Sequence, residues 1–101
     1  VISPTAASSS FPYTPKESMA AIKHWYANDS LRKTILGKYG YYDAFSETEN
    51  WCKPWYLSID QGPQVAMIEN YRSGLLWKLF MSCPEVQNGL KKLGFTSPWI
   101  K

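Results

Sequence analysis

Between Leu57 and Met81 the chain is mostly apolar, and the apolar positions recur with the spacing of a long helix. Asp60 stands where an N-cap is expected, and Gly62 and Pro63 fit the first turn, where proline's missing N–H has no cost. We therefore predict one long helix over about Gln61–Ser82, with Asp60 as its cap.

Four polar residues interrupt this apolar pattern in one sector of the predicted helix: Glu69, Asn70, Arg72 and Ser73. The same sector is apolar one turn before and one or two turns after them, whereas a solvated face stays polar from end to end. We therefore predict a polar cluster in a helix that is otherwise buried all round. A Glu69–Arg72 ion pair is one reading, and contact with a polar ligand is the other.

Local signals predict three further helices and leave long loops between them. A capping box with proline at the first position starts a helix over Pro15–Ala27, and a proline starts the last one, Pro84 to about Gly94. Ser30 is in position to cap a short helix over Leu31–Leu36. The remaining segments are expected to be an extended loop, a short strand or ordered loop, and a polar loop, at Val1–Pro12, Lys38–Phe45 and Ser46–Pro54. The predicted class is all-α with long loops.

Composition and charge narrow the function classes. The 101 residues fit one domain at most, yet 45% are hydrophobic and 16% aromatic, more than a small core needs, which suits a piece of a larger body. The net charge of +3 is spread along the chain without a basic stripe, so nucleic-acid binding is not expected. No apolar run is long enough to span a membrane. The first residues have neither the charged nor the apolar region of a signal peptide.

The cysteines and the single histidine offer no metal site. Cys52 and Cys83 match no zinc spacing, and His24 stands alone, so we expect neither a metal nor a cofactor. A Cys52–Cys83 disulfide remains open, although two free thiols are the prediction.

Candidate chemistry gathers in the loops before the long helix. Asp43 lies in YYDAF, where the aromatic rings would exclude water and raise its pKa, unless it simply bonds backbone N–H groups of a turn. Asp60 at the helix start would stay ionised, as suits a base or a sugar-hydroxyl acceptor, and Gln61 adds an amide. The aromatic rings suited to stacking on pyranose faces are those of Trp51, Trp55, Tyr42 and Tyr56, and each could equally be part of the core. The predicted substrate-binding set is thus Tyr42, Asp43, Trp51, Asp60 and Gln61, with Glu69 and Arg72 as a structural cluster.

Four sequence blocks stand in a characteristic order: YGYYDAF, IDQGP, MIENYRSGLLWKLF and PEVQNGLKKLGF. Together they resemble the C-terminal signature of the bacterial glycoamylase-like domain, which includes the β-1,2-glucanases of glycoside hydrolase family 144. The resemblance implies an (α/α)6 toroid, with residues 1–101 as one segment that supplies its last helices and mouth loops. It also implies a β-glucan hydrolase of the periplasm or cell exterior, whose catalytic acids lie outside this chain.

By this resemblance the partners are an oligosaccharide or β-glucan and the missing N-terminal part of the same domain. The isolated chain is then expected to be inactive, and no catalytic role is assigned to its residues. Two alternatives remain open: a non-catalytic helical module that binds carbohydrate or another protein, and a related toroidal phosphorylase or lyase.

Overall fold

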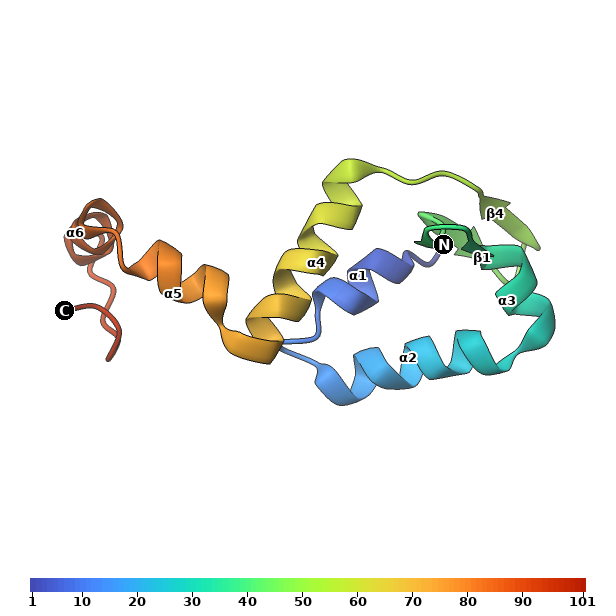
Figure 1. Cartoon of the computed structure of the whole chain (residues 1–101), viewed down its shortest axis with the longest axis horizontal. Coiled ribbons are helices and arrows are strands. Elements are labelled where there is room, and N and C mark those ends of the chain that lie inside the picture. Colours follow the sequence, from blue (N-terminus) through green and yellow to red (C-terminus); the bar gives the residue numbers. More distant parts are fainter.

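A computed structural model describes all residues, 1–101, as a mostly helical chain with two small strand pairs (Figure 1). The predicted all-α class is therefore correct for most of the chain and wrong for the segment between α3 and α4. The elements in order are α1 Pro4–Ser9, α2 Pro15–Ala27, α3 Asp29–Ile35, β1 Leu36–Gly37, β2 Gly40–Tyr41, β3 Ala44–Ser46, β4 Trp51–Lys53, α4 Ser58–Ser73, α5 Leu75–Met81 and α6 Pro84–Lys92.

A small core joins α2, α3 and the strands. Trp25, Ile35 and Phe45 are buried together, and the rings of Trp25 and Phe45 meet edge to face with centroids 5.7 Å apart. Ile2 pairs with Phe45 through two backbone hydrogen bonds of 2.7 and 2.9 Å, so the start of the chain extends the β3–β4 pair. Apolar burial of this kind is what fixes the position of the loops that follow.

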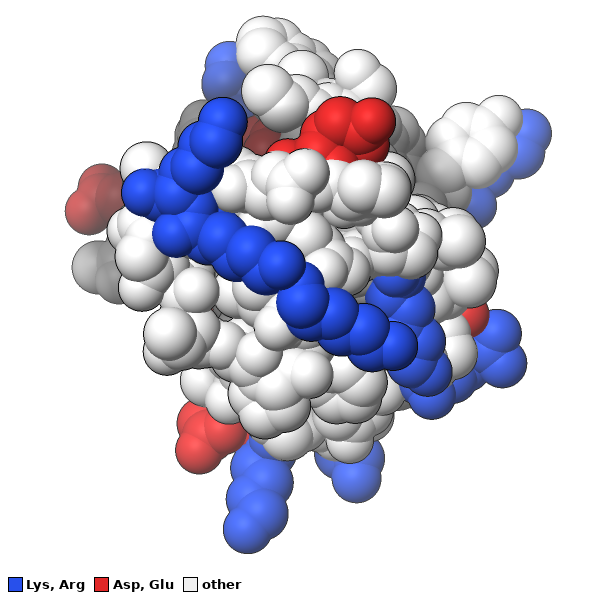
Figure 2. Space-filling model, turned by 90° about the vertical axis from the view of Figure 1, so that its left-hand side faces the viewer, with Lys and Arg blue, Asp and Glu red and all other residues white.

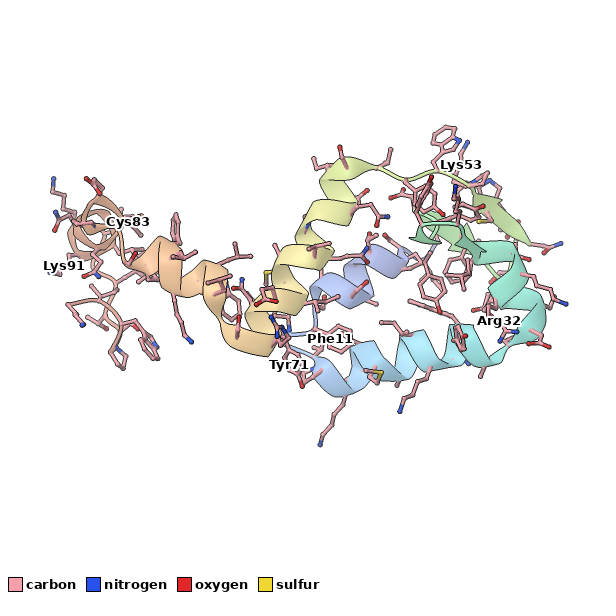
Figure 3. All side chains as sticks on the ribbon, viewed as in Figure 1. Phe11, Arg32, Lys53, Tyr71, Cys83 and Lys91 are labelled. Atoms are coloured by element: carbon pink, nitrogen blue, oxygen red, sulfur yellow. The ribbon has the colours of Figure 1, made fainter.

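The predicted extended loop at Val1–Pro12 is wrong, because it contains helix α1. Pro4 occupies the first turn, where its fixed φ favours a helix. The Ser8 hydroxyl, 2.8 Å from the carbonyl of Pro4, bonds back along the helix, and Thr5 and Ser8 are buried where α1 packs on α4 and α2. At the end of this segment Phe11 packs on Tyr71 of α4, with ring centroids 5.7 Å apart (Figure 3).

The helices with strong local signals are confirmed, although their caps differ. Helix α2 spans Pro15–Ala27 as predicted, but the Thr14 hydroxyl donates to the carbonyl of Ser10 and does not cap it. The short helix begins at Asp29, because Asn28, not Ser30, accepts the N–H of Leu31 at 3.1 Å.

The predicted polar loop at Ser46–Pro54 is wrong in part, because β4 pairs with β3 there. The register places Ala44 opposite Lys53 and Ser46 opposite Trp51. Asn50, with φ 47°, turns the chain between the two strands, a conformation that asparagine tolerates better than most residues.

The predicted long helix is also wrong, because Gly74 divides it. Gly74 adopts φ 69° and ends α4, as glycine commonly does at a helix C-terminus, and it is not a site of close helix approach. At the other end α4 already begins at Ser58, after Leu57, so Asp60 lies in the first turn without capping the helix and Pro63 lies in the second turn.

Beyond Gly74 the chain forms an arm, α5 and α6, that projects away from the other elements (Figure 1). The molecule measures 51 × 24 × 23 Å with a radius of gyration of 17.2 Å, against about 13 Å for a compact domain of this length. Seen from the α6 end, Lys and Arg side chains lie across the middle of the face and project at its edges, and acidic side chains lie above the central band (Figure 2). No helix has both the length and the apolar character needed to cross a bilayer.

Helices α4 and α5 leave most of their apolar side chains exposed. Asn70 is the one buried residue of α4, and α5 has none. The prediction of burial all round is therefore not met within this chain. Large side chains open to solvent along the two helices include Val65, Ile68, Tyr71, Leu75, Trp77, Leu79 and Phe80.

Candidate carbohydrate site

The structure brings the carboxyl groups of Asp43 and Asp60 within hydrogen-bonding reach of each other. Asp43 lies between β2 and β3, whereas Asp60 lies in the first turn of α4. The hydrogen bond with Asp60 raises the pKa of Asp43, and burial and the charge of Asp60 raise it further. Two adjacent carboxylates cannot both ionise easily, so the pair favours holding a proton.

Two backbone contacts hold this pair in place. The N–H of Asp43 donates to the carbonyl of Trp55 at 3.0 Å, which ties the Asp43 loop to the segment that leads into α4. The N–H of Asp60 donates to the carbonyl of Leu57 at 3.0 Å in the first turn of that helix. The residues are 17 positions apart in sequence, and these contacts make them neighbours.

The raised pKa of Asp43 agrees with the expectation from sequence, but its main cause is different. The expected cause was exclusion of water by aromatic rings, whereas the hydrogen bond with Asp60 contributes most. Asp43 also does not bond turn N–H groups: its Oδ1 atom is buried and has no partner. A buried carboxyl oxygen without a hydrogen-bond donor is costly, and a protonated Asp60 carboxyl is a donor that the pair itself supplies.

Gln61 follows Asp60 and is oriented by two polar side chains. Its Oε1 accepts from Nε2 of Gln64 at 2.7 Å, and the Ser8 hydroxyl lies 2.8 Å from Oε1 of Gln64. The Nε2 of Gln61 is buried without a partner. The segment thus supplies an unused amide donor next in sequence to the carboxyl pair, and sugar hydroxyls accept from such donors.

The two aromatic residues of the predicted substrate-binding set lie in different places. Tyr42 directly precedes Asp43 and packs against Tyr56 with ring centroids 5.3 Å apart. Trp51 lies at the opposite end of the β3–β4 pair, where it lines a hollow of about 160 Å³ together with Glu47 and Asn50. The structure therefore gathers Tyr42, Asp43, Asp60 and Gln61 on adjoining segments and leaves Trp51 apart from them.

Glu69 and Arg72 form the predicted ion pair, with two hydrogen bonds of 3.0 Å. The pair is open to solvent, since 75% of the Arg72 side chain is exposed, so it is not the buried cluster expected from the sequence. Hydrogen bonds from Arg72 and from Ser73 lower the pKa of Glu69. Nothing observed at this cluster favours the alternative prediction, that these residues contact a polar ligand.

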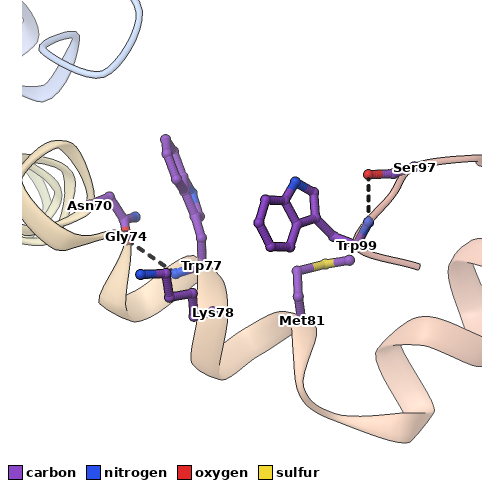
Figure 4. A pocket seen from close by; sticks show the side chains of 7 residues that line it. All are labelled: Asn70, Gly74, Trp77, Lys78, Met81, Ser97 and Trp99. Carbon is purple, nitrogen blue, oxygen red and sulfur yellow. Dashed lines mark hydrogen bonds between the residues drawn. The ribbon is translucent and has the colours of Figure 1, made fainter. Parts of the chain in front are cut away.

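Another hollow, of about 490 Å³, lies between the end of α4 and the arm, and none of the residues of the carboxyl pair lines it. Trp77 and Trp99 border it (Figure 4), and no carboxylate lines it, so it offers no acid–base chemistry. Trp99 keeps 70% of its surface exposed. The full lining is Asn70, Gly74, Trp77, Lys78, Met81, Ser97 and Trp99.

Metal ligands and thiols do not contribute a second site. No group of three or more His, Cys, Asp or Glu side chains is arranged to hold a metal ion. Cys52 and Cys83 are both free, as predicted, and burial raises the pKa of the Cys52 thiol.

Comparison with known proteins places the chain in a family. Residues 1–84 match the family profile described as "Glycoamylase: Putative glucoamylase". A curated exo-β-1,2-glucooligosaccharide sophorohydrolase (non-reducing end) of Parabacteroides distasonis is 48% identical over 92 residues, which are 91% of this chain and 12% of that protein.

Solved structures agree in sequence and in fold. An endo-β-1,2-glucanase from Chitinophaga pinensis, in complex with sophorotriose and glucose, is 70% identical with a TM-score of 0.88, over 97% of this chain and 23% of that one. A structure from Bacteroides uniformis described as a putative glucoamylase is 57% identical with a TM-score of 0.90, over 99% of this chain and 24% of that one. The chain therefore spans a quarter or less of these relatives, and it belongs to the glycoamylase family.

Proposed function

We propose that this chain is part of a glycoside hydrolase that cleaves β-1,2-glucan. The 70% identity with an endo-β-1,2-glucanase, over 97% of the chain, is the observation that carries the proposal. Within that enzyme, residues 1–101 would supply the C-terminal helices and mouth loops of an (α/α)6 toroid. The exposed apolar faces of α4 and α5 support this placement, because such surfaces usually lie against further protein.

The carboxyl pair fits a role in holding substrate better than a role in cleavage. Glycosidases place their two catalytic carboxyl groups about 5–5.5 Å apart for retention or about 6.5–9.5 Å apart for inversion. Asp43 and Asp60 touch each other, which leaves no room for a glycosidic bond between them. We assign them, with Gln61 and Tyr42, to the glucan-binding wall, and the catalytic carboxyl groups to the rest of the protein.

The proposal has two further parts, a role for Trp51 and a location for the enzyme. Trp51 would stack on a more distant sugar of the glucan, since its ring lines a separate hollow with polar groups around it. The whole enzyme would act in the periplasm or outside the cell, where polymeric glucan is encountered before uptake.

Asparagine substitutions in the longer protein test the proposed wall. Asp43→Asn and Asp60→Asn should each lower kcat/KM on β-1,2-glucan at least about tenfold, or about 1.4 kcal/mol in transition-state stabilisation. Glu49→Gln is the matched control, because Glu49 is an exposed carboxylate in the turn between β3 and β4 and should leave the kinetics unchanged.

Two results would contradict the proposal. One is an unsubstituted protein that releases no sophoro-oligosaccharides from β-1,2-glucan, and the other is unchanged kinetics in both aspartate variants. Calorimetry on the isolated chain tests the alternative, since tight binding of gluco-oligosaccharides that depends on Trp51 would indicate a non-catalytic binding module.

A further inference from the structure

We propose that Tyr56 is a positioning residue that holds the Asp43 loop against the start of α4 and thereby sets the contact between Asp43 and Asp60. The consequence for catalysis rests on the proposed function, but the contacts of Tyr56 do not. Tyr56 lies between Trp55, whose carbonyl binds the Asp43 backbone, and Leu57, after which α4 begins.

The hydroxyl group of Tyr56 makes two hydrogen bonds to the turn between β1 and β2. It accepts from the N–H of Tyr39 at 3.1 Å and donates to the carbonyl of Gly40 at 3.2 Å. Both partners are backbone groups of consecutive residues, so one side chain satisfies a donor and an acceptor of the turn. The bonds tie this turn to the segment that enters α4.

The ring of Tyr56 makes a second set of contacts with the same loop. It packs against Tyr42 at 5.3 Å and against Tyr39 at 5.7 Å, in tilted and edge-on arrangements that aromatic pairs prefer. Tyr42 directly precedes Asp43, so the position of its ring constrains the backbone that carries the carboxyl group. The hydrogen bonds of Tyr56 therefore hold the turn at Tyr39 and Gly40, and its ring holds Tyr42, next to Asp43.

Gly37 leaves the space that this arrangement needs. A Cβ atom at Gly37 would collide with the Tyr56 hydroxyl and would lie 2.5 Å from Cζ of Tyr42. The two phenol rings thus rest directly on the backbone of β1, where a larger residue does not fit. Tyr56 is half-buried, and its ring contacts and two hydrogen bonds limit its freedom to move, as a positioning residue requires.

The electrostatics of the pair depend on this placement. Asp60 is the one charged side chain that influences the pKa of Asp43, and it acts through a hydrogen bond and through its charge. If the loop moved away from α4, both contributions would weaken, and the pKa of Asp43 would fall toward its ordinary value.

Tyr56→Phe in the longer protein isolates the hydroxyl group. The ring and its contact with Tyr42 remain, whereas the two backbone hydrogen bonds are lost. We expect KM for β-1,2-glucan to rise about tenfold with kcat within about twofold, and any limb of the pH profile that reports Asp43 to move to lower pH. Tyr39→Phe is the matched control, since the Tyr39 ring is 71% exposed, and it should change neither value.

The outcomes separate this inference from the proposed function. Unchanged KM and pH profile in Tyr56→Phe would overturn it, as would a lower Tm accompanied by an unmoved pH profile. If the unsubstituted protein does not hydrolyse β-1,2-glucan, the proposed function fails. A carboxyl ¹³C NMR titration of Asp43 in both proteins then decides the inference alone: a lower Asp43 pKa in Tyr56→Phe supports it, and an equal pKa overturns it.

Discussion

Tyr42 and Tyr56 fill the space beside Gly37 that a side chain would otherwise occupy. This close approach makes Gly37 the most demanding glycine of the chain, although its backbone conformation is ordinary. Gly89, in the middle of α6, has no atom near the position of a Cβ. Replacement by alanine is therefore expected to have opposite effects on stability at Gly37 and at Gly89.

Gly37→Ala should destabilise the protein by about 1–3 kcal/mol, the usual cost of forcing extra volume into a packed site. Gly89→Ala should stabilise it by up to about 1 kcal/mol, because alanine is the better helix former. Thermal unfolding of both variants checks this. Equal shifts in Tm would show that the tyrosines do not rest on β1 as described.

Residue chemistry alone predicted part of the candidate site. Tyr42, Asp43, Asp60 and Gln61 stand next to polar or aromatic neighbours in sequence, and the fold gathers them. Trp51 offered the same aromatic signal, but the strand register places it opposite Ser46, at the far end of the pair. Such a register comes from strand pairing that the short, irregular pattern does not specify.

At the scale of elements, two helix starts marked by proline were predicted correctly, whereas the predicted cap residues Thr14, Ser30 and Asp60 were wrong. Pro15 and Pro84 start their helices as expected from proline's fixed φ. Helix α1 was missed because it packs mainly on α4, which begins 49 positions after α1 ends, and also on α2. Gly74 was read as an interior glycine, since the apolar pattern continues across it, whereas its left-handed conformation ends the helix.

Asn70 joins the two helices across this break. Its Oδ1 accepts the N–H of Trp77 at 3.1 Å, and the side chain is buried. The first N–H groups of α5 lack helical partners, so Asn70 acts as a cap supplied from α4.

Asn70→Ala should therefore cost about 1–2 kcal/mol, the usual loss for a helix cap. Asn88→Ala, at an exposed position of α6, is the control and should cost less than about 0.5 kcal/mol. Urea unfolding of the two variants measures the difference. A loss at Asn88 as large as at Asn70 would rule out the capping role.

For the whole molecule, the main feature is apolar surface without a partner in this chain. The toroid was expected from a family resemblance, and what this chain shows by itself is an expanded shape with open faces on α4 and α5. A helix pattern indicates which residues are apolar but not which neighbour covers them. The protein surface that covers the exposed faces of α4 and α5 therefore could not be derived from these residues alone.

The isolated chain should bind the dye 1-anilinonaphthalene-8-sulfonate and self-associate, because many large apolar side chains of α4 and α5 are exposed to solvent. The longer protein, in which the proposed toroid covers these faces, should do neither. Fluorescence and small-angle X-ray scattering provide the comparison. A monodisperse isolated chain with no increase in dye fluorescence would contradict the proposed covering.

The packing of α1 on α4 also constrains how the protein is made. During synthesis Pro4–Ser9 leaves the ribosome well before Ser58–Ser73, and a helix of six residues is not stable without a partner. The early segment must therefore wait unfolded until the later helix reaches it, and the intervening residues form the loop that closes. Slow translation between these segments would lengthen the time for which Phe11 and its neighbours remain available to chaperones.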